Sequence, residues 1–263
     1  AYAYAYGTVG ELFAWFIGWN LILEYMMGAT TVAVAWSGYF VKLLHLFGIE
    51  FPIWLCNDMA TATEKSLAAN LAAPSFAFNL PAFLITWVVT AILVKGIKEA
   101  AKTNNVIVII KIAVVLFVII VGAFYIKTEN WTPFIPAEIP ALDELGNATG
   151  KMNFGFGGVL TAATIVFFAY IGFDAVSTQA GEEKKKKKDV PFAIVASLII
   201  CTVLYILVSL VLTGMVKYTE LDRAAPVASA FSGIGINWAV FIITIAATAG
   251  LTSVMLVMML GQT

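Results

Sequence analysis

Four ionisable side chains lie within or beside long apolar stretches of this sequence, namely Glu11, Glu24, Lys111 and Asp174. A charge at the centre of a lipid bilayer costs at least about 2.5–3.5 kcal/mol, so such a residue usually faces a cavity or a partner. Lys111 is the clearest case, because apolar residues flank it on both sides. A buried amine can bind and release a proton in the physiological range. The alternative is that the Lys111 side chain extends to the membrane interface.

The two glutamates have simpler alternatives to a chemical role. Glu24 lies near the middle of the first apolar run, where structural pairing inside a helix bundle and a part in proton coupling are both open. Glu11 precedes the same run and fits an acid at the start of a helix, where the helix dipole favours a negative charge.

Aromatic, small and acidic residues meet in the segment Phe167–Asp174, which reads FFAYIGFD. Glycine costs about 1 kcal/mol inside a helix, so the Ile171–Gly172 step is a place where a helix can break. A break at membrane depth frees backbone groups, which are tolerated only around a cavity filled by water or ligand. Carbonyls there suit an ammonium group and N–H groups suit a carboxylate, so the pattern predicts an amino-acid site. A simple packing glycine is the alternative.

The composition requires a membrane. Of the 263 residues, 61% are hydrophobic and 12% are charged, against about 45–50% and about 25% in soluble domains. The excess apolar surface must face lipid. The net charge of −1 argues against a nucleic-acid partner. Cys56 and Cys201 are predicted to remain free thiols, and the single His45 leaves no catalytic triad or metal cluster, so no enzyme activity, metal or cofactor is expected.

A bilayer core about 30 Å thick needs roughly 20 apolar residues in a helix. The sequence contains six such runs in one transmembrane domain over residues 1–263, at residues 12–47, 76–94, 106–126, 154–177, 190–216 and 236–260. These runs are continuous rather than alternating, and open sheet edges cannot lie in lipid, so the spans are predicted to be helices. The first run exceeds one perpendicular span and should be tilted or extend past the bilayer.

Loop charges predict an orientation. Lys95, Lys98 and Lys102 lie between the second and third runs, and Lys184–Lys188 lie between the fourth and fifth, while the other loops hold many acids. Short Lys-rich loops face the cytoplasm, so both ends of the chain should face it too. The lysine run Lys184–Lys188 is either a plain solvated loop or a segment that attracts anionic lipid.

Several motifs occur in order along nearly the whole chain: Gly10–Trp15, Trp19–Tyr25, Lys95–Glu99, Asn130–Phe134, Phe167–Thr178 and Ala249–Ser253, with the ending Gly261–Thr263. Together they make the chain resemble the cationic amino acid transporter family of the amino acid–polyamine–organocation superfamily. The resemblance implies a LeuT-type fold of two inverted five-helix repeats, in which the six runs match helices three to eight. We therefore expect a piece of a longer transporter. The Lys184–Lys188 run departs from the family pattern.

The resemblance also implies roles for individual residues. Lys111 matches a lysine that replaces a sodium ion in proton-coupled members, and Ser253 and Thr252 match hydroxyls near that amine. A further group matches the substrate site at the broken sixth helix, namely Phe168, Ala169, Ile171 and the following Asp174. Met255 and Met258 are expected to border the side-chain pocket, with ordinary packing as the alternative.

These observations predict a secondary-active amino-acid transporter of the cell membrane. It should be proton-coupled, use alternating access, and carry cationic or small neutral amino acids, with the amino acid, the proton and membrane lipid as its partners. An exchanger or uniporter of the same fold is the nearest alternative. A non-transporting membrane scaffold or channel fragment is the alternative from a different class.

Overall fold

The structure is a computed structural model that describes residues 2–95, 100–142, 148–172, 186–222 and 224–261. Helix predominates in this part of the chain, as the continuous apolar runs predicted. The chain forms two compact units. One unit contains Ile126–Tyr218, and the other contains Tyr2–Tyr125 together with Thr219–Thr263.

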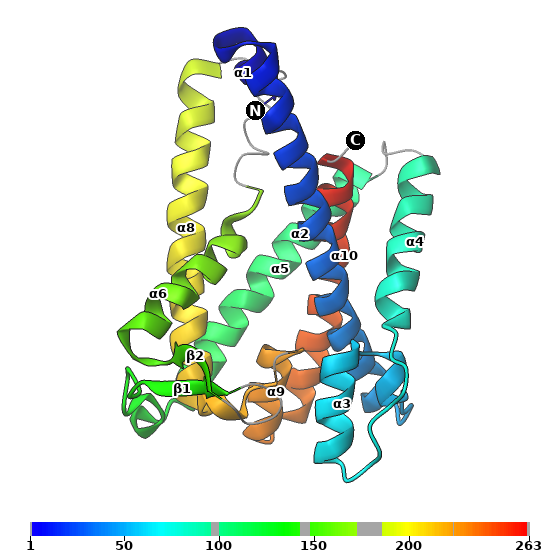
Figure 1. Ribbon diagram of the computed structural model, residues 1–263, viewed down its shortest axis with the longest axis vertical. Helices are drawn as coiled ribbons and strands as arrows, with labels where there is room; N and C mark the ends of the chain where they lie inside the picture. The colour runs from blue at the N-terminus through cyan, green and yellow to red at the C-terminus, as the bar shows by residue number, and fades with distance from the viewer. Residues whose placement is uncertain (1, 96–99, 143–147, 173–185, 223, 262–263) are drawn as a thin grey trace. The chain divides into compact units, whose positions relative to one another are not determined.

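The larger unit consists mainly of helices: α1 (Tyr2–Val9), α2 (Glu11–Leu46), η1 (Ile53–Leu55), α3 (Met59–Ala68), α4 (Leu80–Lys95), α5 (Ala100–Ala123), α9 (Pro226–Gly233) and α10 (Asn237–Gly261). Helices α2 and α10 pack against each other along their length (Figure 1). The two helices are antiparallel, since Tyr25 of α2 lies near Gly261 while Phe47 stacks edge-on against Phe241. With 36 residues, α2 is about 54 Å long, well beyond one perpendicular bilayer span.

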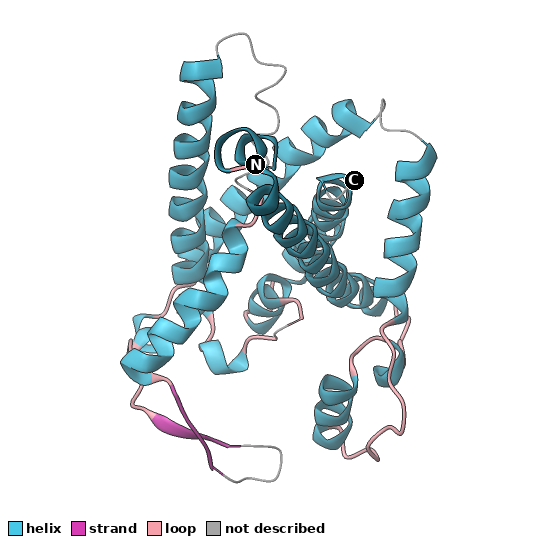
Figure 2. Cartoon of the chain, turned by 45° about the horizontal axis from the view of Figure 1, so that its top comes forward, coloured by secondary structure: helices cyan, strands magenta, loops and turns pink. Residues whose placement is uncertain are grey.

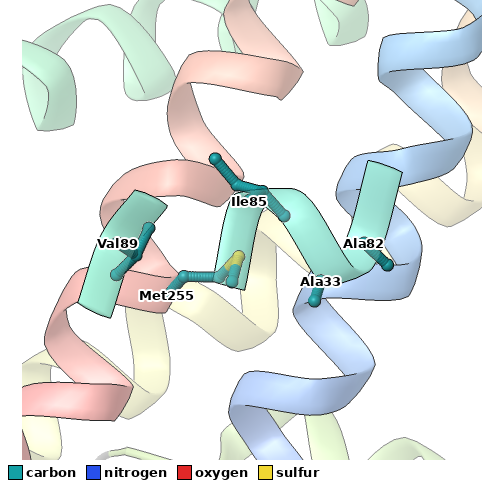
Figure 3. Packing of buried hydrophobic residues seen from close by; sticks show 5 residues of the cluster. All are labelled: Ala33, Ala82, Ile85, Val89 and Met255. Atoms are coloured by element: carbon teal, nitrogen blue, oxygen red, sulfur yellow. The ribbon is translucent and has the colours of Figure 1, made fainter. Parts of the chain in front are cut away.

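Small residues line the α2 face that packs inward, including the buried Gly28, Ala29, Ala33 and Ser37. Small side chains let membrane helices approach closely, because lipid supplies no hydrophobic force to drive the helices together. A core cluster forms where α2, α4 and α10 meet, and its buried members are Ala33, Ala82, Ile85, Val89 and Met255. Figure 3 shows these five side chains gathered between the three helices.

Helix α4 starts at Leu80, later than the predicted start at residue 76 of its apolar run. The reason is a side-chain cap. Asn79 Oδ1 accepts a hydrogen bond of 3.1 Å from the Ala82 backbone N–H, which satisfies one of the unpaired donors of the first turn. The buried Ser37 hydroxyl donates to the same oxygen at 2.6 Å. One amide oxygen therefore begins α4 and ties it to α2.

The loops hold short elements that hydropathy did not predict. Asp58 caps α3 by accepting from the Thr61 backbone N–H at 3.0 Å and from the Thr61 hydroxyl at 2.6 Å. These hydrogen bonds favour the ionised carboxylate and hold the pKa of Asp58 below its ordinary value.

At the start of the chain, α1 folds onto α2, where the Tyr2 ring lies over Gly18.

The smaller unit contains η2 (Thr128–Trp131), β1 (Ile139–Leu142), β2 (Ala148–Asn153), α6 (Gly155–Val166), η3 (Phe167–Tyr170) and α8 (Lys186–Met215). The two strands form an antiparallel hairpin, with Ile139 opposite Asn153, in the loop before α6 (Figure 2). Gly155 begins α6 with a φ of +60°, and a β-carbon there would overlap the Glu138 side chain. Both the positive φ and the close Glu138 side chain favour glycine at this turn.

The loop before the hairpin caps the end of α8. The Lys127 backbone N–H and the Asn130 side-chain amide both donate to the Gly214 carbonyl, at 2.9 and 2.7 Å. The Trp131 indole donates to the Thr213 hydroxyl at 3.2 Å. The first two bonds satisfy the Gly214 carbonyl, which the helix end leaves without a partner from the helix itself, and the Trp131 bond adds a side-chain contact to the same turn.

Three helical segments are long and apolar enough to cross a membrane: Glu11–Leu46, Val190–Met215 and Asn237–Gly261. Shorter apolar helical segments are Leu80–Lys95, Ile107–Ala123 and Gly155–Tyr170. Each of the six predicted runs therefore contains helix. Helix α5 begins at Ala100 and α8 at Lys186, in both cases before the predicted apolar run starts.

Candidate functional site

The Lys111 side chain leaves α5 toward α10. An added β-carbon at Gly250 would lie 3.0 Å from both Cγ and Cδ of Lys111 and 3.8 Å from Cε. The aliphatic stem is therefore in contact with the α10 backbone, and Lys111 is half-buried. Ser253, which is 2% exposed, lies three residues further along α10 on the same face. The structure thus brings Lys111 within one helical turn of the predicted hydroxyl partner.

Thr252 ties α2 to α10. Its hydroxyl donates to the Thr248 carbonyl at 2.9 Å and accepts from the Trp36 indole N–H at 2.9 Å. A hydroxyl has one proton, so the proton of Thr252 is already used within α10. The sequence reasoning missed Trp36, although an indole N–H inside an apolar run needs an acceptor.

Glu24 lies at a different level of the bundle from Lys111. Its neighbour Tyr25 packs against Gly261 at the end of α10. Gly261 is eleven residues from Gly250, which corresponds to about 16 Å along the helix axis. Glu24 itself is half-buried. The structure therefore does not place Glu24 at the level of the Lys111 contact.

Met255 and Met258, the two α10 methionines predicted to border the pocket, differ in their surroundings. Met255 is completely buried in the core cluster with Ala33 and Val89 (Figure 3). Met258 is half-buried. Met255 packs in the core cluster, and its expected place beside a substrate pocket stays a prediction.

The fourth apolar run is interrupted where the glycine pattern predicted. The α-helix ends at Val166 and continues as a single 3₁₀ segment to Tyr170. The Ile171 N–H bonds to the Phe168 carbonyl at 3.2 Å, and Ile171 then leaves the helical region with a ψ of 133°. Gly172 follows with a φ of +101°, which favours glycine. The helix thus ends at the residues where the sequence predicted an interruption, and the residues after Gly172, over which the span would resume, lie outside the described part of the chain.

The backbone at this interruption is held by α8. The Tyr205 hydroxyl donates to the Ala169 carbonyl at 2.9 Å, and the Tyr170 hydroxyl lies 2.9 Å from the Thr202 hydroxyl. Phe168 is 36% exposed and Ile171 is half-buried. Asp174 lies outside the described residues. Sequence reasoning missed Thr202 and Tyr205, because nothing in an isolated apolar run marks them.

Possible metal ligands do not form a site in the part of the chain that the structure describes. Among those residues, no group of three or more His, Cys, Asp or Glu side chains could hold a metal ion.

Comparison with known proteins identifies the family. The family model described as amino acid permease matches residues 1–263. The chain belongs to the amino acid permease family. The chain is therefore part of an all-α, multi-pass membrane protein, and the predicted resemblance to amino acid transporters is confirmed.

The chain is similar to several named transporters. It is 44% identical over 263 residues to the branched-chain amino acid permease BcaP of Bacillus subtilis (strain 168), covering 100% of this chain and 51% of that protein. It is 43% identical over 261 residues to the methylthioribose transporter of the same organism, covering 99% and 50%. It is 37% identical over 260 residues to cationic amino acid transporter 9, chloroplastic, of Arabidopsis thaliana, covering 98% and 41%.

The permease thus spans about half the length of the curated relatives it matches. These relatives are permeases and transporters rather than enzymes.

Proposed function

We propose that this chain is part of a secondary-active transporter that moves cationic or small neutral amino acids by alternating access. The names of the relatives support an amino-acid substrate, since they include a branched-chain amino acid permease and cationic amino acid transporters. The methylthioribose transporter is a relative with a different named substrate. The LeuT-type inverted repeat belongs to the same proposal.

The substrate would bind at the interruption of the α6–η3 segment. Backbone carbonyls at this helix end have two lone pairs each and would bind the ammonium group, the Ala169 carbonyl in addition to its hydrogen bond from Tyr205. N–H groups of a following half-helix would bind the carboxylate. Phe168 would contribute an aromatic wall, and Asp174 would follow the break. A single site that accepts both charged groups is selective for amino acids over amines or acids alone.

Proton coupling would depend on Lys111. The observation that supports this role is the packing of its stem on Gly250, one turn of α10 from the buried Ser253. Burial favours the neutral amine, whereas nearby hydroxyl and carbonyl oxygens favour the ammonium form. A protonated lysine would then replace the cation that stabilises this junction in sodium-coupled relatives.

The proposed orientation has both ends of the chain in the cytoplasm of a cell-membrane protein. The support is the lysine content of residues 95–102 and 184–188, which face the cytoplasm under the positive-inside rule. The lysines at 184–188 would also attract anionic lipid, at about 1 kcal/mol for each residue near the surface.

The test uses the transporter that contains this chain, reconstituted in proteoliposomes. Lys111→Met keeps roughly the length of the side chain and removes its charge. We expect this variant to lose uptake driven by an imposed pH gradient while it keeps substrate counterflow. Lys217→Met, which changes an exposed lysine after the end of α8, is the matched control and should behave as the wild type.

Other outcomes separate the alternatives. Uptake by Lys111→Met that keeps its pH dependence would exclude Lys111 from coupling. Wild-type counterflow without a response to the pH gradient would indicate an exchanger or uniporter. The absence of counterflow in the wild type would favour a membrane scaffold.

A further inference from the structure

The end of the η3 segment has a carbonyl that the helix cannot satisfy. Helix termini leave their last four carbonyls without partners from the helix itself. At this terminus the Phe168 carbonyl accepts from the Ile171 N–H, and the Ala169 carbonyl accepts from the Tyr205 hydroxyl at 2.9 Å. Tyr205 lies on α8, so the neighbouring helix caps the interruption.

A second hydrogen bond acts one residue later. The Thr202 hydroxyl donates to the Leu198 carbonyl at 2.7 Å, which uses its only proton. The Tyr170 hydroxyl, 2.9 Å from Thr202 Oγ1, must therefore be the donor in that pair. The hydrogen bond between η3 and α8 therefore runs from the Tyr170 hydroxyl, as donor, to the Thr202 oxygen, as acceptor.

The Tyr205–Ala169 and Tyr170–Thr202 hydrogen bonds join the same two segments side by side. Thr202 and Tyr205 are three residues apart and so lie on one face of α8. Their partners, Ala169 and Tyr170, are adjacent in sequence. The rings of Tyr170 and Tyr205 also meet edge to face, with centroids 5.5 Å apart and planes at 71°. Edge-to-face contact is a favoured aromatic geometry, and it fixes both hydroxyl groups relative to the backbone.

We propose that Thr202 and Tyr205 are positioning residues that hold the interrupted end of the α6–η3 segment in its substrate-binding geometry. This inference rests on the proposed function, which places the substrate at the interruption. A backbone that is already ordered loses less freedom when ligand binds, so the ordering contributes to affinity.

The test combines transport kinetics with hydrogen exchange, again in the transporter that contains this chain. Tyr205→Phe removes one oxygen and keeps the ring contact with Tyr170. We expect faster backbone exchange in residues 167–172 and a rise of about 2- to 10-fold in the KM for substrate, with the maximal rate unchanged. Thr202→Val should act in the same direction, and Thr202→Ser, which keeps the hydroxyl, should restore the wild-type values.

Tyr218→Phe is the matched control, since Tyr218 is an exposed tyrosine in the η5 segment (Tyr218–Glu220). Unchanged exchange in both Tyr205→Phe and Thr202→Val would overturn the proposal without any transport measurement. Faster exchange with an unchanged KM would show that Thr202 and Tyr205 stabilise the helix end without affecting substrate binding. That result would overturn the proposal as well. A wild type without saturable uptake would refute the proposed function, and this inference with it. If Tyr205→Phe does not fold, Thr202→Val alone decides.

Discussion

The Lys111 stem rests on Gly250, and a β-carbon at that glycine would stand 3.0 Å from the Cγ and Cδ atoms of the lysine. Real β-carbons seldom have contacts this short, so the absence of a side chain at Gly250 defines where Lys111 lies. The glycine thereby leaves room for the lysine stem against the α10 turn that leads to Ser253. The lack of a side chain at Gly250 therefore allows the Lys111 stem to lie against α10.

Gly250→Ala should therefore alter coupling without unfolding the protein. The lysine stem is flexible and can move aside, while alanine gains up to about 1 kcal/mol in helix propensity over glycine. We expect pH-gradient-driven uptake to fall about 3- to 10-fold, or about 0.7–1.4 kcal/mol, with thermal stability equal or higher. Gly7→Ala in α1 is the matched control, because its added methyl group meets no atom within 4 Å. An unchanged pH response in a folded Gly250→Ala protein would contradict this role.

The thiol of Cys56 tests both the orientation and a local pKa. Burial raises the pKa of Cys56, and the nearby Lys65 ammonium lowers it to a smaller extent. The thiolate is the reactive form, so labelling by an impermeant maleimide from outside should be slow at pH 7 and accelerate as the pH rises toward 9. Cys201, inside the α8 span, should remain unlabelled.

Lys65→Met should slow the labelling of Cys56 further, because it removes the positive charge that favours the thiolate. Cys56→Ser serves as the blank. Labelling of Cys56 only after the membrane is permeabilised would reverse the proposed orientation. Faster labelling in Lys65→Met would contradict the electrostatic account.

The shared acceptor at Asn79 predicts a measurable coupling between α2 and α4. Asn79→Ala removes the helix cap and leaves the buried Ser37 hydroxyl without its acceptor, so we expect a loss of about 2–4 kcal/mol in stability. Ser37→Ala should cost about 0.5–1.5 kcal/mol. The double variant should be less damaging than the sum, by about 1 kcal/mol.

Thermal unfolding in detergent, followed by tryptophan fluorescence, gives these differences. Asn79→Asp keeps an Oδ1 acceptor for both the Ala82 N–H and the Ser37 hydroxyl and should stay close to the wild type. Thr63→Ala is a control, since the exposed Thr63 hydroxyl bonds only within α3, to the Met59 carbonyl. Strict additivity of Ser37→Ala and Asn79→Ala would show that the shared oxygen does not couple the helices.

Local chemistry was readable from the sequence alone. Continuous apolar runs predicted helices because only helices satisfy backbone groups along such stretches in lipid. The Ile171–Gly172 step predicted the interruption because glycine is unfavourable inside a helix. The structure added that Gly172 has a positive φ, which favours glycine. Lys111 was noticeable because a charge inside an apolar run is costly in a membrane and usually faces a cavity or a partner. Polar loops gave no such signal, so α3 and the β1–β2 hairpin went unpredicted.

Which side chains meet was decided only by the tertiary structure. Trp36 and Thr252 are 216 residues apart, and Tyr205 and Ala169 are 36 apart, so neither pair has a local signature. In a soluble helix, an apolar stripe marks the face that will be buried. In a membrane helix the lipid-facing and core-facing sides are equally apolar, and sequence periodicity cannot tell one face from the other. The sequence therefore determined the helices and the break, while helix packing determined that Lys111 meets Gly250 and that α8 caps Ala169.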